Sequence, residues 1–313
     1  MNADPQMLWL GAGIGGILVV SSVVGAILKA VVRTEGGQAT VANLNARIRA
    51  WWVMVLVFGL ALALGGLGLV VLFGLLSFLG LREFITLAPT KRGDHRTLFW
   101  AFFVVVPAQY YFVKADWYGM FSIFIPVYVF LFVPVRTALA GDCDGFLERT
   151  AKIQWGLMVC VYCLSYAPAL MTLRIAGYDG QNAKLVVYLL AVAQLSDVFQ
   201  YVWGKTLGRH KVAPTVSPSK TWEGLIGGLL TATGLGAALW WATPFSPLQS
   251  AGLSLVITLA GFFGGLVMSA IKRDRGVKDY GALIEGHGGV MDRVDSLSFA
   301  APVFFHAVRY FFT

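Results

Sequence analysis

Charged and glycine residues gather near the end of an otherwise apolar chain, in the stretch AIKRDRGVKDYGALIEGHGGVMDRVDSLSF that begins at Ala270. Asp292 and Asp295 are three residues apart, so they share one face of a helix that leads into the last apolar segment. Lys278 and Asp279 precede them across a glycine-containing loop. Carboxylate oxygens suit Mg²⁺, which binds through one or two carboxylates together with substrate phosphates and water. The stretch therefore predicts a metal site.

The sequence His287-Gly288-Gly289 lies between these acidic residues and opens the predicted last helix. Glycine lets the backbone approach a ligand closely, and the amino terminus of a helix offers free N–H groups to phosphate. The pattern predicts that a metal and a triphosphate meet here. Charge alone leaves another interpretation open, because mixed charge in a loop is usually a solvated face with incidental ion pairs. His287 alone would be a hydrogen-bonded structural residue.

The composition places these residues in an integral membrane protein. The chain has 313 residues, of which 58% are hydrophobic and only 13% are charged, against about 25% charged in soluble domains. Its mean hydropathy is +0.72. The net charge of +8 is explained by basic loops between spans, so we expect no nucleic-acid partner.

Apolar segments of about 17 to 25 residues can cross a bilayer as helices, and the sequence contains ten candidates. They lie at about 8–32, 51–65, 67–87, 97–113, 119–140, 154–173, 184–204, 223–243, 251–271 and 296–312. The second and third form one continuous run, which we divide at Gly65-Gly66 because it is too long for one span. The first is too long for the core of a signal peptide, and we interpret it as a retained anchor.

The distribution of basic residues predicts the orientation, since Lys and Arg accumulate in cytoplasmic loops. With the amino terminus outside, all but Lys114, Arg174, Lys184 and Arg309 of the 24 basic residues fall in or beside loops on the inner side. The two loops at about 205–222 and 272–295 then both face the cytoplasm. We expect an all-α polytopic protein in which residues 1–313 form a single membrane domain, and a homodimer through its glycine-rich spans is left open.

The order and spacing of the charged residues resemble the signature of the CDP-diacylglycerol synthases, also called phosphatidate cytidylyltransferases. Eleven positions match in Ser269-x-x-Lys272-Arg273-x4-Lys278-Asp279 and in His287-Gly288-Gly289-x-x-Asp292-Arg293-x-Asp295. A second block is similar to the family, with Leu195-Ser196-Asp197 followed by Gly204, by Gly208-Arg209-His210-Lys211 and by Ser217-Pro218-x-Lys220-Thr221-Trp222-Glu223-Gly224. The specific resemblance covers 195–296, the predicted catalytic region, and residues 1–50 look like an additional span and loop.

The resemblance implies that CTP and phosphatidic acid react to give CDP-diacylglycerol and pyrophosphate, with Mg²⁺ and possibly a second cation. Such a transfer needs aligned groups and charge neutralisation more than covalent chemistry from the protein. The implied metal ligands or their neighbours are Asp279, Asp292, Asp295 and Asp197. The implied catalytic and phosphate-holding residues are Lys272, Arg273, Lys278, Asp279, His287, Asp292 and Arg293. The implied substrate-binding residues are Ser217, Lys220, Thr221, Trp222, Glu223, Gly288 and Gly289, although Trp222 suits an interfacial anchor equally well.

Two departures from the family pattern affect the expected metal site. The family usually reads Gly-Asp-Leu-x-Glu-Ser before the first block, whereas this chain has Gly265 and Met268 in place of the two acidic residues. The position before Gly286 is usually proline, and here it is Glu285. We hypothesise that Glu285 restores the missing charge and serves as a metal ligand. A divergent paralogue with altered metal use is the competing interpretation.

Three functions are therefore open, with the first preferred. The chain transfers the CMP group of CTP to phosphatidic acid, or to another lipid phosphate such as an isoprenoid phosphate, or it is a transporter. Transporter sites tend to lie near the bilayer midplane, whereas these carboxylates lie at one face. Because CTP is cytosolic, we expect a multi-pass protein of the bacterial inner membrane with its active site facing the cytoplasm.

Overall fold

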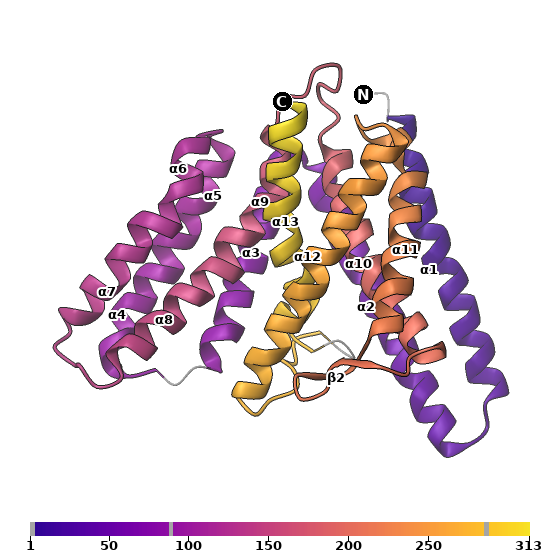
Figure 1. The fold of residues 1–313 in the computed structure, drawn as a ribbon, viewed down its shortest axis with the longest axis horizontal. Coiled ribbons are helices and arrows are strands. Elements are labelled where there is room, and N and C mark those ends of the chain that lie inside the picture. Colours follow the sequence, from indigo (N-terminus) through magenta and orange to yellow (C-terminus); the bar gives the residue numbers. More distant parts are fainter. Residues whose placement is uncertain (1–3, 88–89, 285–287) are drawn as a thin grey trace.

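The computed structural model describes residues 4–87, 90–284 and 288–313, which are almost entirely helical. Long helices run side by side and span the height of the molecule (Figure 1). Among the described residues the only strands are β1 (Lys211–Ala213) and β2 (Ser217–Thr221), which form a small antiparallel hairpin. The prediction of an all-α polytopic membrane protein is confirmed.

Eight helical segments of the described chain are long and apolar enough to cross a membrane. Five are single helices: α1 (Pro5–Val31), α2 (Glu35–Ala63), α3 (Gly65–Thr86), α10 (Ala183–Thr206) and α12 (Pro247–Asp274). Three are composite: Arg92–Lys114 contains α4 (His95–Trp100) and α5 (Val106–Lys114), Tyr118–Ala138 contains α6 (Tyr118–Ile123) and α7 (Phe130–Ala138), and Phe146–Thr172 contains α8 (Phe146–Leu157) and α9 (Leu164–Ala169).

Two further helices coincide with the other predicted spans. Helix α11 (Trp222–Ala238) has only 17 residues, and α13 (Met291–Phe312) has Asp292, Arg293 and Asp295 in its first turns. Neither meets the length and apolarity expected of a spanning helix. The count of ten spans therefore stays a prediction.

The predicted division of the long apolar run at Gly65 is confirmed. Helix α2 ends at Ala63 and α3 begins at Gly65, whose φ of 70° lies in the left-handed region that glycine adopts without strain. This tight turn at Leu64 and Gly65 separates α2 from α3, and the two helices pack against each other.

The predicted loop between the first two spans is largely wrong. We expected a loop over about 33–50, whereas α2 is continuous from Glu35. This segment contains no proline, and alanine, asparagine and arginine fill it without interrupting the helix. Val41, Ala46 and Ile48 are buried, which gives the segment an apolar stripe that packs against α1.

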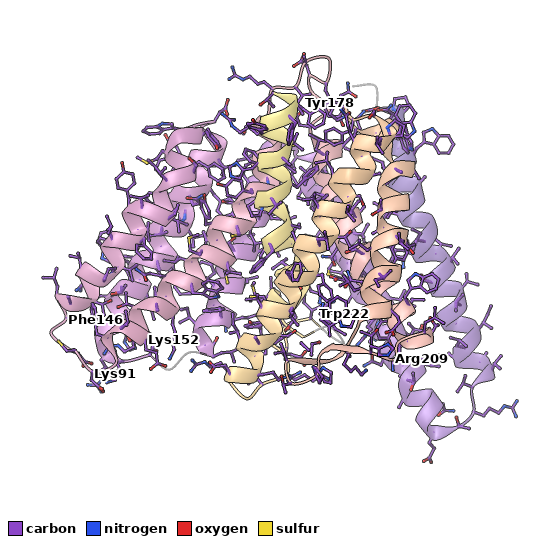
Figure 2. All side chains as sticks on the ribbon, viewed as in Figure 1. Lys91, Phe146, Lys152, Tyr178, Arg209 and Trp222 are labelled. Carbon is purple, nitrogen blue, oxygen red and sulfur yellow. The ribbon has the colours of Figure 1, made fainter. Side chains whose placement is uncertain are left out.

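The segments predicted to face inward all lie at one end of the molecule, the lower end in Figure 1, and the two labelled termini lie at the other. Figure 2 places Lys91, Lys152 and Arg209 at the lower end and Tyr178 at the upper end. This shared end, which we call the motif end, also carries the hairpin and the segment that joins α12 to α13. The arrangement agrees with the predicted alternation of loops.

Glycines bring the helices that carry the motifs into close contact. A Cβ atom on Gly228 of α11 would lie 2.4 Å from Cγ of Gln200 on α10, a distance that real side chains do not reach. Gly228 thus lets α10 and α11 approach each other closely, as small residues do between membrane helices. Helices α10, α11, α12 and α13 form a contiguous group, which fixes the positions of the side chains at its motif end.

Candidate functional site

Two carboxylates from different helices meet at the first turns of α13. The hydroxyl of Ser296 donates a 2.6 Å hydrogen bond to Oδ2 of Asp197 on α10. The backbone N–H of Ser296 donates a 2.8 Å bond to Oδ1 of Asp295, which is also 3.4 Å from the hydroxyl. The structure therefore gathers Asp197 and Asp295, which are 98 residues apart in the sequence, around one serine.

Basic side chains lie beside this carboxylate pair. Nζ of Lys220, from β2, lies 4.5 Å from the centre of the Phe262 ring, and it interacts electrostatically with both Asp197 and Asp295. Arg293 also lies within electrostatic range of both carboxylates. Its Nε is buried and has no hydrogen-bond partner in the described part of the chain. The pair is thus flanked by positive groups that suit an anionic substrate.

Gly265 lies in the same place, so the departure from the family pattern falls inside the site. A Cβ atom on Gly265 would lie 3.4 Å from Nζ of Lys220 and 3.9 Å from Oδ2 of Asp295. Residues 4–87, 90–284 and 288–313 contain no group of three or more acidic, histidine or cysteine side chains arranged to hold a metal. Two carboxylates nevertheless fit Mg²⁺, which completes its shell with water and substrate phosphates.

Asp292 makes a different set of contacts from Asp295. Its Oδ1 accepts a 2.8 Å bond from Nζ of Lys272, and its Oδ2 accepts bonds of 2.8 and 3.0 Å from the N–H groups of Tyr280 and Gly289. Only 3% of the side chain is exposed. Both oxygens are committed to the protein, so this geometry suits an anchor between α12, the joining segment and α13.

Glu83 closes the amino terminus of α13, a role that the sequence did not reveal. Its two carboxylate oxygens accept 2.9 Å bonds from the N–H groups of Val290 and Met291. Together with Asp292 it occupies the N–H groups of residues 289–291. The expectation that this terminus offers them to phosphate is therefore wrong.

Gly288 explains how the joining segment approaches α13 so closely. Its φ is 79°, and a Cβ atom there would lie 2.8 Å from Oδ2 of Asp292 and 3.2 Å from Cβ of Asp279. Only glycine fits this position. Glu285 and His287 lie outside the described residues, so their predicted roles stay predictions.

The remaining predicted residues surround this centre at the motif end. The exposed Arg273 donates hydrogen bonds to the carbonyls of Val216 and Val277, which ties α12 to the hairpin and to the joining segment. Lys278 and Asp279 are exposed.

Several predicted substrate-binding residues are engaged in the hairpin. Ser217 and Thr221 are buried, and the hydroxyl of Thr221 caps α11 by accepting a 3.1 Å bond from the N–H of Gly224. Glu223 accepts hydrogen bonds from the N–H groups of Arg209 and His210. Trp222 is half exposed, consistent with an interfacial anchor.

Replacing Thr221 by valine should destabilise the protein through the lost cap. We expect the free energy of unfolding to fall by about 1 kcal/mol, while Thr221→Ser keeps most of the stability. Thermal unfolding of the purified variants in the same detergent measures the difference. Equal stability of Thr221→Val and the parent protein would contradict the capping role.

Comparison with known proteins shows the family of the chain. The model of the Cytidylyltransferase family matches residues 45–311. The chain belongs to this family. Three relatives illustrate the similarity. The uncharacterized protein YnbB of Escherichia coli (strain K12) is 41% identical over 88% of this chain and 89% of the relative. A phosphatidate cytidylyltransferase of Staphylococcus aureus (strain COL) is 29% identical over 80% of this chain and 94% of the relative. One of Bacillus subtilis (strain 168) is 30% identical over 68% and 77%.

Membership of the cytidylyltransferase family confirms the resemblance seen in the motifs. It supports a nucleotidyltransferase in preference to a transporter, and the apolar helices place that activity in a multi-pass membrane protein. The match begins at residue 45, within the first half of α2. That residues 1–50 are an addition to the family stays a prediction, as does a homodimer.

Proposed function

We propose that this protein transfers the cytidylyl group of CTP to phosphatidic acid, giving CDP-diacylglycerol and pyrophosphate. The observation that carries the proposal is the meeting of Asp197 and Asp295 beside Lys220 and Arg293 at the motif end. Such a centre can hold a cation and two anionic substrates together. Two relatives with similarity over most of their length are phosphatidate cytidylyltransferases, which supports this acceptor.

In the proposed reaction an oxygen of the lipid phosphate attacks the α-phosphorus of CTP. The bond from that phosphorus to the oxygen bridging the α- and β-phosphates breaks, and pyrophosphate leaves. Lys220 and Arg293 would neutralise the oxygens on which charge develops. Asp197 and Asp295 would hold Mg²⁺, which when bound shields the phosphate charge so that two anions can approach each other.

The other motif residues would hold this centre in place or receive the substrates at its rim. Lys272 and Asp292 lock α12 to α13, so they position Asp295 without touching substrate in this geometry. The exposed Lys278 and Arg273 lie at the open end, where they would meet the phosphates of incoming CTP.

The cellular location follows from the substrates and the loops. CTP is cytosolic and phosphatidic acid is a membrane lipid, so the site belongs at the cytoplasmic face of the bacterial inner membrane. The motif end carries the basic loops that favour this side.

A carboxylate introduced at Gly265 tests the composition of the metal site. Gly265→Asp would add a third carboxylate beside Asp295, and we expect the Mg²⁺ concentration for half-maximal turnover to fall about threefold to tenfold. A Mg²⁺ titration of pyrophosphate release measures this concentration. An unchanged or higher value would show that the new carboxylate pairs with Lys220 instead, and the two-carboxylate metal site would lose its support.

The acceptor lipid is tested by identifying the product. Purified protein is incubated with Mg²⁺, CTP and either phosphatidic acid or an isoprenoid phosphate in the same detergent, and mass spectrometry detects the CDP-lipid. The proposal expects CDP-diacylglycerol from phosphatidic acid. If a CDP-lipid formed only from the isoprenoid phosphate, phosphatidic acid would be ruled out as the acceptor and the isoprenoid phosphate would take its place in the proposal.

A further inference from the structure

A groove of about 350 Å³ lies at the motif end between α3, α8 and α12. Its apolar wall is formed by Phe84, Leu87, Trp155 and Ile271. Ala151 and four charged side chains complete the lining, the charged ones being Lys152, Glu148, Arg275 and Asp274. None of the carboxylates and cations of the proposed catalytic centre lines the groove, which makes it a separate feature of the surface.

The charged side chains of the groove differ in their exposure. Lys152 and Arg275 have only 15% and 25% of their side chains exposed, whereas 66% of both Glu148 and Asp274 is exposed. Lys152 pairs with Glu148, and Arg275 lies 2.9 Å from Asp274 and 4.0 Å from Glu148. The cations are thus the more buried members of each pair, and the acids lie toward water. An anion inside the groove would meet the cations first.

The apolar wall of the groove lies next to its charged side chains. Trp155 is 44% exposed and follows Lys152 by one turn of α8. Tryptophan with neighbouring basic residues is typical of the membrane interface, where an aromatic ring lies at the level of the head groups. The groove therefore has charged side chains beside an apolar wall, which matches the change from head group to chain in a phospholipid.

We propose that this groove binds a glycerophospholipid with an anionic head group from the same leaflet. The head group would take the place of Glu148 and Asp274 on Lys152 and Arg275, and an acyl chain would lie along Trp155 and Phe84. Basic side chains between membrane helices can bind anionic head groups, and in this groove the two cations are the more buried of the charged side chains. The inference concerns lipid binding and does not depend on the proposed reaction.

Quenching of tryptophan fluorescence tests the proposal at the groove itself. The protein is reconstituted in phosphatidylcholine vesicles that contain rising fractions of brominated phosphatidylglycerol, or of brominated phosphatidylcholine at the same fractions. The signal of Trp155 is obtained by subtracting the emission of Trp155→Phe. We expect brominated phosphatidylglycerol to quench Trp155 at a severalfold lower mole fraction than brominated phosphatidylcholine.

A double variant and a matched control locate the binding. Lys152→Gln with Arg275→Gln should abolish the preference for the anionic lipid. Lys205→Gln with Lys211→Gln removes two exposed cations elsewhere at the motif end and should retain it. Equal quenching by the two lipids, or a preference that survives the groove variant, would overturn the proposal. Loss of the preference on adding millimolar inorganic phosphate would also overturn it, in favour of a site for small anions.

Discussion

Replacing Asp295 by asparagine is expected to lower the rate of CTP turnover by roughly 100-fold or more, the scale for losing one group that stabilises a charged transition state. Asparagine has the same shape, and its amide oxygen can still accept the hydrogen bond from the N–H of Ser296. The start of α13 should therefore persist, while one of the two negative charges offered to the cation is lost. Steady-state release of pyrophosphate measures the rate, and thermal unfolding verifies the fold.

The control for this variant is the same chemical change at the opposite end of the molecule. Asp179 lies between α9 and α10 and follows Tyr178, which Figure 2 labels at the end opposite the motif end, so Asp179→Asn should leave the rate unchanged. Asp197→Asn should match Asp295→Asn, because both carboxylates contact Ser296. If Asp295→Asn kept more than half of the parental rate, the carboxylate pair would not be the metal site.

Replacing Glu83 by glutamine is expected to have the second largest effect. One carboxylate oxygen becomes an NH₂ group that faces a backbone N–H of α13, so one donor at the helix terminus is left without an acceptor. An unsatisfied buried donor costs about 1 to 3 kcal/mol. We therefore expect a lower unfolding temperature, together with a roughly tenfold lower turnover as Asp295 shifts from its place.

The readouts separate positioning from general loss of stability. Turnover is measured well below the unfolding temperature of the variant, where a role in positioning still lowers the rate and raises the Mg²⁺ requirement. Glu35→Gln is the matched control, because it makes the same chemical change at an exposed glutamate in the first turn of α2. Normal turnover and normal Mg²⁺ dependence in Glu83→Gln would contradict the positioning role.

Hydropathy and charge predicted much of the architecture, because the membrane directly constrains the length of the apolar segments and the side on which basic loops lie. Apolar length sets where helices cross, and the break at Gly65 follows from the excess length of one run. The extension of α2 to Glu35 was missed, since its first turns are polar enough to resemble a loop. Only contact with α1 shows that they are helical and packed.

The candidate site was predicted as a set of residue types and not as a set of contacts. The sequence pattern gave Asp292 and Asp295 the same expected role, because both lie on one face at the start of the last helix. In the structure Asp292 is held by Lys272 and two N–H groups, whereas Asp295 lies beside Asp197 at Ser296. Glu83 is 207 residues from its partner Val290, so no local pattern connects them. A carboxylate near the end of an apolar segment does signal a partner, because it would otherwise be costly there.

The structure shows which part of the candidate site is affected by the glycine at position 265, where the family usually has an aspartate. The glycine faces Lys220 and Asp295, so the change affects the centre and not its periphery. The sequence alone could not show whether residue 265 lies at the centre of the site or at its periphery. With two carboxylates in place, the proposed site still offers as many as Mg²⁺ usually takes from a protein.

The central claim is that CTP reacts with phosphatidic acid at the carboxylate pair. Its most direct test is the release of pyrophosphate from CTP by purified protein with Mg²⁺, with and without phosphatidic acid, and with Asp295→Asn in parallel. We predict release that requires phosphatidic acid and is lost in the variant. Release that is independent of phosphatidic acid, or no release from a folded parent protein, would contradict the claim.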